Sequence, residues 1–141
     1  MTDSNVYACG IPFLNNRVLL GFRAPHRRIY PSRWDVLGGK VEAQESLEEA
    51  LARELAEEIG IVPLSTSYLR AVTDDVPTAG GLLRYEMYLV KSWRGDAVNA
   101  SPEHTRIAWF TIPEAIALPD LAVEAYRELF KQIETLTSAD R

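Results

Sequence analysis

The 141-residue sequence contains a single cysteine, Cys9, so no disulfide can join two parts of the chain. Its stability must therefore come from packing and from any metal that it binds. Cys9 lies in an apolar segment rich in strand-forming residues. We expect it to be a small core residue rather than a nucleophile.

The chain also lacks a long apolar run and an excess of positive charge. No stretch approaches the roughly 20 apolar residues of a membrane span, and the first residues, Met-Thr-Asp-Ser-Asn, contain no basic or apolar signal region. We therefore expect a cytoplasmic protein without a membrane partner. The net charge of −5 argues against a nucleic-acid polymer as partner. Length and a 47% hydrophobic content predict a single domain over residues 1–141.

Acidic residues are abundant, and some fall where a helix should be apolar. A helix from Ser46 to Ile59 would place three leucines on one face: Leu47, Leu51 and Leu55. Glu54 and Glu58 project into that face, and Glu57 lies at its edge. Carboxylates there repel one another and cost several kcal/mol to desolvate unless a cation lies among them. A solvated charged face is the alternative, but Glu48 and Glu49 already supply one.

The ends of this helix are also marked in the sequence. Ser46 followed three residues later by Glu49 matches the capping box of a helix N-terminus. Gly60 suits a left-handed C-cap, and Pro63 opposes continuation. These residues predict the register of the helix and hence the direction of its carboxylates.

The segment from Gly39 to Ile61 resembles the signature of the Nudix hydrolases, G-x5-E-x7-R-E-U-x-E-E-x-G-U, where U is aliphatic. Every specified position is matched: Gly39, Glu45, Arg53, Glu54, Leu55, Glu57, Glu58, Gly60 and Ile61. Chance agreement is on the order of one in a billion at average residue usage. The resemblance implies an α/β fold of the Nudix type, an α/β/α sandwich with a mixed β-sheet. It also implies metal-dependent hydrolysis of a pyrophosphate bond in a nucleoside diphosphate linked to another moiety.

The resemblance also suggests roles for the matching residues. Glu54, Glu57 and Glu58 match metal-binding positions, and the peptide carbonyl of Gly39 or its neighbour is a further metal ligand in this family. The implied cofactor is Mg²⁺, with Mn²⁺ as the alternative. Glu57 or Glu58 is also eligible to orient or deprotonate the attacking water. Glu45 and Arg53 match positions that hold loop and helix together, for which we expect a salt bridge.

Glu103 is a separate candidate in a late loop. In many members of the family a carboxylate from this region completes the metal site or acts as general base. A solvated loop glutamate is the alternative. We expect the neighbouring His104 to lie at the surface.

Basic residues cluster between positions 23 and 33, where acidic residues are absent: Arg23, His26, Arg27, Arg28 and Arg33. Guanidinium groups suit phosphate oxygens, so Arg23 and Arg33 are candidate substrate-binding residues. A solvated loop is the alternative. Asp120 is a candidate for reading the edge of a base, or else the N-cap of the last helix. Five aromatic residues could stack on a base, of which we expect one or two to face ligand: Tyr7, Phe22, Tyr30, Trp34 and Tyr85.

The segments 17–23 and 34–42 resemble those of Nudix members that cleave nucleoside triphosphates, including oxidised ones such as 8-oxo-dGTP. Leu37 replaces the proline often found before the paired glycines. We therefore expect a triphosphate as substrate, giving a monophosphate and pyrophosphate. ADP-ribose, a dinucleotide or a sugar nucleotide is the alternative, followed by a non-catalytic metabolite-sensing module. A homodimer through an exposed strand edge is compatible with the sequence.

The rest of the chain reads as strands and two further helices. Residues 14–16 and 78–81 are predicted hairpin turns, and 112–117 a short helical turn that begins with Thr111 and Pro113. Apolar residues at helical spacing predict a last helix over 121–136. Extended segments are expected at 6–13, 17–22, 34–37, 67–73, 83–93 and 106–110. This order favours a mixed sheet between helices.

Overall fold

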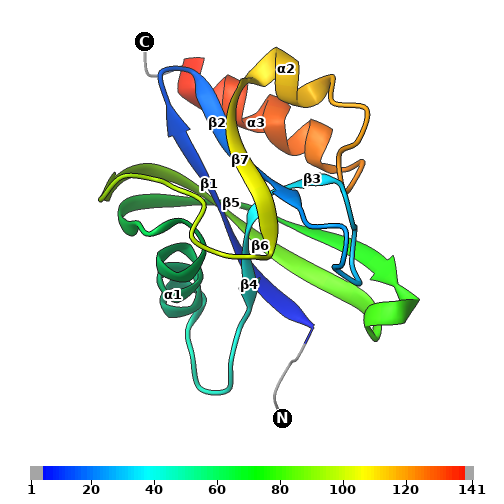
Figure 1. Ribbon diagram of the computed structural model, residues 1–141. Helices are drawn as coiled ribbons and strands as arrows, with labels where there is room; N and C mark the ends of the chain where they lie inside the picture. The colour runs from blue at the N-terminus through cyan, green and yellow to red at the C-terminus, as the bar shows by residue number, and fades with distance from the viewer. Residues whose placement is uncertain (1–4, 139–141) are drawn as a thin grey trace.

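The computed structural model describes residues 5–138 (Figure 1). The first four and last three residues of the predicted domain, including most of the segment examined for a signal region, lie outside the described residues. Within the described range, none of the helices is long and apolar enough to cross a membrane.

The chain opens with the predicted hairpin. Strand β1, Val6–Leu14, pairs with β2, Arg17–Arg23. Asn15 and Asn16 between them have φ angles of 53° and 63°, as in the tight turns that match the twist of a hairpin. Asparagine tolerates this left-handed conformation better than most residues.

In the described part of the chain, seven strands form one mixed sheet, with the main order β3-β2-β1-β6-β5. β5, Val62–Val76, and β6, Gly81–Arg94, form the second predicted hairpin, joined by the 3₁₀ turn η1, Pro77–Ala79. β6 runs parallel to β1, whereas every other pairing is antiparallel. β4, Leu37–Lys40, pairs with β1; β3, Trp34–Asp35, and β7, His104–Thr111, pair with β2.

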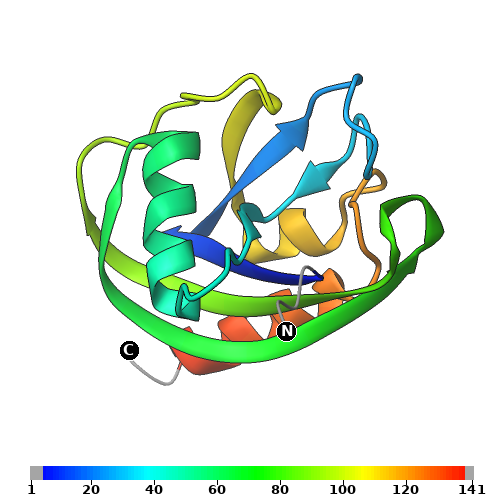
Figure 2. The same ribbon diagram turned by 90° about the horizontal axis from the view of Figure 1, so that it is seen from below.

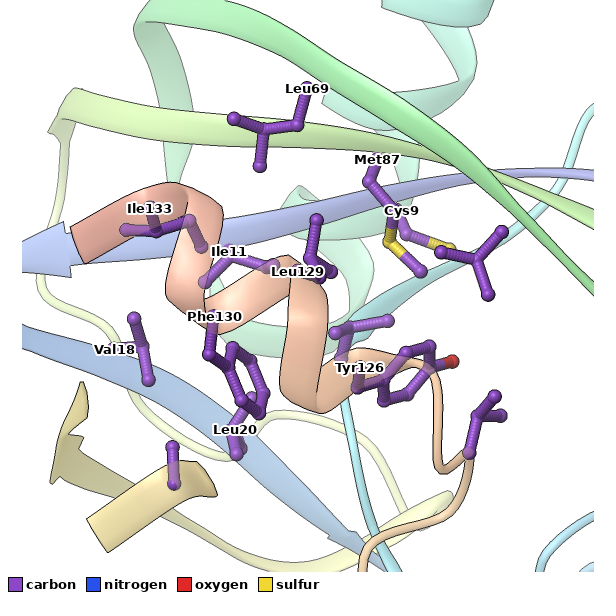
Figure 3. Close-up of a cluster of buried hydrophobic side chains, with 14 of the residues drawn as sticks. Cys9, Ile11, Val18, Leu20, Leu69, Met87, Tyr126, Leu129, Phe130 and Ile133 are labelled. Carbon is purple, nitrogen blue, oxygen red and sulfur yellow. The ribbon is translucent and has the colours of Figure 1, made fainter. Parts of the chain in front are cut away.

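Helices cover both faces of this sheet, which confirms the predicted sandwich. α1, Leu47–Ile59, lies on one face, and α2, Ile112–Ile116, and α3, Tyr126–Ser138, lie on the other. Figure 2 shows the long β5–β6 hairpin passing between α1 and α3. Successive residues of β1 point to opposite faces of the sheet, each of which has its own hydrophobic core. Ala8 packs in the core beneath α1, and Cys9 packs in the core beneath α3 (Figure 3).

The start of the last helix was predicted wrongly. α3 begins at Tyr126, whereas Leu121 forms an isolated parallel bridge with Trp34 of β3, between a turn and a bend. The backbone N–H of Trp34 donates to the carbonyl of Asp120 at 2.9 Å, and that of Ala122 donates to the carbonyl of Trp34 at 2.8 Å. Leu121 is therefore buried by a strand-like contact, and its helical spacing from the later apolar residues is incidental.

Candidate active site

The capping residues of α1 lie as predicted and set the direction of its carboxylates. The Ser46 hydroxyl accepts from the backbone N–H of Glu49 at 3.0 Å, and the Glu49 carboxylate accepts from the backbone N–H of Ser46 at 2.8 Å. Gly60 closes the helix with φ of 72°. In this register Glu58 is buried, Glu54 is half-buried and Glu57 is exposed.

Glu58 is the most enclosed carboxylate of the helix, with 2% of its surface exposed. One carboxylate oxygen accepts from the backbone N–H of Gly38 at 3.0 Å. Burial raises the pKa of Glu58 well above its usual value; the Gly38 N–H opposes this shift, while the carboxylates of Glu54 and Glu103 add to it. The structure thus brings the helix, the glycine segment and the Glu103 loop together.

Glu54 lies against the glycine segment from the same helix. A Cβ atom on Gly39 would lie 2.4 Å from the carboxyl carbon of Glu54, so a side chain there would displace the Glu54 carboxylate. Burial raises the pKa of Glu54, and the adjacent Arg53 opposes the shift while Glu57 and Glu103 reinforce it. The Glu54 carboxylate therefore lies against the backbone of Gly39 as well as beside the guanidinium of Arg53.

Arg53 holds the loop before α1, which confirms the predicted salt bridge with Glu45. Its Nε donates to Glu45 at 2.7 Å, and its Nη2 donates to the carbonyl of Lys40 at 3.0 Å. Its Nη1 lies 2.8 Å from a carboxylate oxygen of Glu54 and 3.6 Å from one of Glu57. Hydrogen bonds from Arg53 lower the pKa of Glu45 to about 2. Arg53 therefore joins the loop to two of the predicted metal ligands.

The chemistry of this donor set fits a hard divalent cation. Carboxylate and peptide oxygens are the ligands that Mg²⁺ and Mn²⁺ prefer. Burial raises the pKa values of Glu54 and Glu58, and for Glu54 it outweighs the opposing effect of Arg53, so a bound cation would favour the charged forms of both. Across residues 5–138 no three acidic, histidine or cysteine side chains already converge on one point. Coordination would therefore require side-chain rotation, including that of Glu54 and Glu57 away from Arg53.

A cavity of about 600 Å³ lies beside these carboxylates. Arg23, His26, Arg27 and Arg28 of the predicted basic patch line it, together with Gly39, Glu54 and Glu103. Arg33 is exposed and is not among the lining residues, although its carbonyl accepts from the Arg23 N–H at 2.9 Å. The cavity is thus lined by both cationic side chains and carboxylates. This arrangement suits a metal-bound phosphate chain.

Arg23 is held in place by Asp35. The sequence analysis did not identify Asp35 as a residue of the site. Its Nε donates to the carbonyl of Ile29 at 2.6 Å, and its Nη1 lies 3.2 Å from Asp35. Asp35 is 6% exposed, and its other oxygen accepts from the Val36 N–H at 2.8 Å. Burial raises the pKa of Asp35, while Arg23 and then Tyr126 oppose the shift. A charged residue within the short apolar run from Trp34 to Leu37 was the available signal.

Glu103 reaches the cavity, but its neighbour was predicted wrongly. The Glu103 carboxylate lies 2.6 Å from Nη1 of Arg27. His104 is 4% exposed, not at the surface, because it begins β7 and packs against β2. A Cβ on Gly21 would lie 2.5 Å from its ring. Within residues 5–138 its Nδ1 atom has no hydrogen-bond partner.

We expect the burial of His104 to make the free energy of unfolding decrease as the pH is lowered below neutral. Burial, reinforced by Arg23, lowers its pKa from 6.5 to about 4. The unfolded chain therefore binds a proton between these pH values that the folded chain does not. The neutral His104 therefore contributes fully to the free energy of unfolding above pH 6.5. As the pH falls from 6.5 to 4, this free energy decreases by about 2–3 kcal/mol. Urea unfolding of wild type and His104→Phe at several pH values would measure this difference in slope.

The matched control for that prediction is His26→Gln, which alters the other histidine at an exposed position. It should keep the wild-type slope between pH 6.5 and 4. An equal slope in wild type and His104→Phe would contradict a neutral, buried His104.

The remaining candidates divide between cavity and core. Tyr7, Tyr30 and Tyr85 line the cavity, one more aromatic than expected, whereas Phe22 and Trp34 pack edge to face at 5.1 Å. Cys9 is 4% exposed as predicted for a core residue, and burial raises its pKa. Asp120 does not line the cavity, and its proposed N-cap role is wrong because α3 begins at Tyr126.

Comparison with known proteins gives a consistent result. A sequence model of the NUDIX domain matches residues 4–133. The CTP pyrophosphohydrolase of Escherichia coli is 30% identical over 105 residues, which is 74% of each chain. The 8-oxo-dGTP diphosphatase of Haemophilus influenzae is 44% identical over 59 residues, so this match spans 42% of each chain. A MutT NUDIX hydrolase crystal structure from Burkholderia pseudomallei has a TM-score of 0.80 at 27% identity, covering 92% of this chain and 97% of that one.

Proposed function

Since the chain belongs to the Nudix hydrolase family, we propose that it hydrolyses a nucleoside triphosphate to a monophosphate and pyrophosphate in a divalent-metal-dependent reaction. The observation that carries this proposal is that Glu54, whose carboxylate neighbours that of the buried Glu58, lines an arginine-bearing cavity. These carboxylates need positive charge, and the cavity offers room for an anion beside them. Relatives named CTP pyrophosphohydrolase and 8-oxo-dGTP diphosphatase support the triphosphate as substrate class.

The proposed metal ligands are Glu54, Glu57, Glu58 and the carbonyl of Gly39. Mg²⁺ or Mn²⁺ held there would neutralise phosphate charge and lower the pKa of a bound water. Gly38 orients Glu58 through its backbone N–H. Arg53 holds the carboxylates of Glu54 and Glu57 before a metal binds, and both would rotate away from Arg53 to reach the metal. In this proposal the protein's side chains position the metal and the phosphates and transfer a proton, and none of them forms a covalent bond to the substrate.

Proton acceptance is proposed for Glu57, Glu58 or Glu103. Glu103 lines the cavity, and its ion pair with Arg27 gives it a defined position before substrate binds. Arg23, held by Asp35 and the Ile29 carbonyl, is proposed to bind phosphate oxygens. For Arg33 and Asp120, contact with the substrate remains a prediction without support from the cavity lining.

Hydrolysis of ADP-ribose, a dinucleotide or a sugar nucleotide is the alternative within the family. A non-catalytic sensor is less favoured because every specified residue of the Nudix signature is present. The single domain over residues 1–141, the cytoplasmic location and a homodimer also remain predictions.

We expect the purified protein with Mg²⁺ to release pyrophosphate and a monophosphate from at least one nucleoside triphosphate. Product-resolved chromatography should cover normal and oxidised triphosphates, ADP-ribose, dinucleotides and sugar nucleotides, with chelator-treated enzyme as the control. Turnover of ADP-ribose or a dinucleotide alone would replace the proposed substrate class. Binding without turnover across the panel would favour the sensor.

A further inference from the structure

Two tyrosines that line the cavity belong to a chain of hydrogen bonds. The hydroxyl oxygens of Tyr30 and Tyr85 lie 2.8 Å apart, and the Tyr30 hydroxyl donates to the carboxylate of Asp74 at 2.6 Å. The three residues come from the loop after β2, from β6 and from β5. This chain therefore ties the arginine-bearing loop to the β5–β6 hairpin.

The order of protons in this chain is fixed by its last member. A carboxylate only accepts hydrogen bonds, and each phenol has one proton to donate. Tyr30 gives its proton to Asp74, so Tyr85 must give its own proton to Tyr30. Burial raises the pKa of both phenols, which keeps them protonated in neutral solution. The Tyr85 oxygen is left with lone pairs only and can act toward a ligand solely as an acceptor.

Tyr85 is well placed to meet the base of a bound nucleotide. It is 5% exposed, lines the cavity, and contacts the ring of Tyr7 edge to face at 5.3 Å. β1 lies between β6 and β4, the strand of Gly39, so Tyr85 stands two strands away from the carboxylate site. Two strand spacings are roughly 10 Å. Phosphates at the carboxylates would therefore leave the base for the tyrosine end.

We propose that the Tyr85 hydroxyl, oriented by Tyr30 and Asp74, is a fixed hydrogen-bond acceptor that selects nucleobases with an exocyclic amine over bases that present an oxygen or hydrogen there. The proposal rests on the proposed function for the identity of the ligand as a nucleotide. A base amine donates to the free lone pair, whereas a base carbonyl places a second acceptor against it in a buried site. Tyr85 is thus a specificity-determining residue, and Tyr30 is a positioning residue.

The test compares binding of monophosphates whose bases differ in an exocyclic amine. In CMP with UMP and in AMP with IMP, an oxo group replaces the amine and the adjacent ring nitrogen gains a proton; in GMP with IMP, a hydrogen replaces the amine. Isothermal calorimetry on the full chain would measure each Kd for wild type and Tyr85→Phe. We expect wild type to prefer the amine-bearing member of at least one pair by about tenfold, and Tyr85→Phe to prefer it by less than about twofold. Absence of any amine preference in wild type, or its survival in Tyr85→Phe, would overturn the proposal.

Two further variants separate this role from a general loss of phenols. Tyr88→Phe removes a hydroxyl from the same strand, but that hydroxyl lies 3.3 Å from Glu48 on the α1 side; its preference should equal that of wild type. Tyr30→Phe frees the Tyr85 proton, so the variant should bind the oxo member of the pair better than wild type does. A wild-type preference in Tyr30→Phe would contradict the proton order.

Monophosphate binding also separates this inference from the proposed function. If no triphosphate is hydrolysed but the amine preference exists and depends on Tyr85, the proposed reaction fails and the inference stands. If triphosphates are hydrolysed without an amine preference, the inference fails alone.

Discussion

Glu58→Gln is expected to reduce kcat by about 10³-fold, within the range typical for loss of a group that activates or positions a water. Glu58 is the carboxylate of α1 that lies deepest, at 2% exposure, with burial raising its pKa and three neighbouring carboxylates adding to the shift. Its negative charge is unfavourable in the folded chain unless a cation is bound. A charge kept at such a position is more consistent with function than with stability.

The glutamine variant isolates that charge because its shape is nearly unchanged. The amide oxygen can still accept from the Gly38 N–H, so the contact between α1 and β4 should persist. Removing an unbalanced buried charge should leave the free energy of unfolding equal to or above that of wild type. Activity and stability should therefore move independently.

Steady-state kinetics over a range of Mg²⁺ concentrations, together with urea unfolding, would measure both quantities. Glu48→Gln is the matched control, since it changes a glutamate on the exposed side of the same helix. Wild-type turnover and Mg²⁺ dependence in Glu58→Gln, and also in Glu57→Gln, would show that this helix does not hold the metal.

Gly38→Ala is expected to lower the free energy of unfolding by about 4 kcal/mol, from backbone strain and overpacking together. Gly38 has φ of 144°, which side chains with a Cβ rarely adopt. An added Cβ would lie 2.1 Å from the carbonyl oxygen of Ala8 and 2.7 Å from the Cα of Cys9. Both obstacles are backbone of the paired strand β1, so neither can rotate away.

Gly60→Ala provides the comparison that separates strain from collision. Gly60 also has a positive φ, 72°, but no atom beyond its immediate chain neighbours lies within 4 Å of its Cβ position. Its replacement should cost about 1 kcal/mol. Urea unfolding of the two variants beside wild type would measure the difference. Equal losses would mean that β1 and β4 can separate without penalty.

The local elements of this fold were predictable, because their determinants lie close together in the sequence. Ser46, Glu49 and Gly60 set both ends of α1, and Asn15 and Asn16 formed the expected turn. The same reasoning failed at α3, where Leu121 is buried by pairing with Trp34 from a distant strand. A helical spacing of apolar residues cannot distinguish these two ways of being buried.

The candidate site was predictable only in part, for the same reason. The glutamates of α1 were found because their spacing in one helix reveals their direction. The burial of His104 and the anchoring of Arg23 by Asp35 depend on strands that meet only in the folded chain. The contact of Tyr30 with Tyr85 joins residues on opposite sides of α1 in the sequence. No local pattern carries such information.

The parallel pairing of β1 with β6 has a consequence for synthesis of the chain. Val6 pairs with Arg84, and Tyr7 pairs with Tyr85, so β1 gains one of its central neighbours only after more than 70 further residues have been made. Such long-range pairing slows folding, because a large loop must close before the contact forms. The complete signature helix emerges from the ribosome well before β6. The growing chain therefore carries the chemistry-bearing helix for some time without the cavity that would give it a substrate.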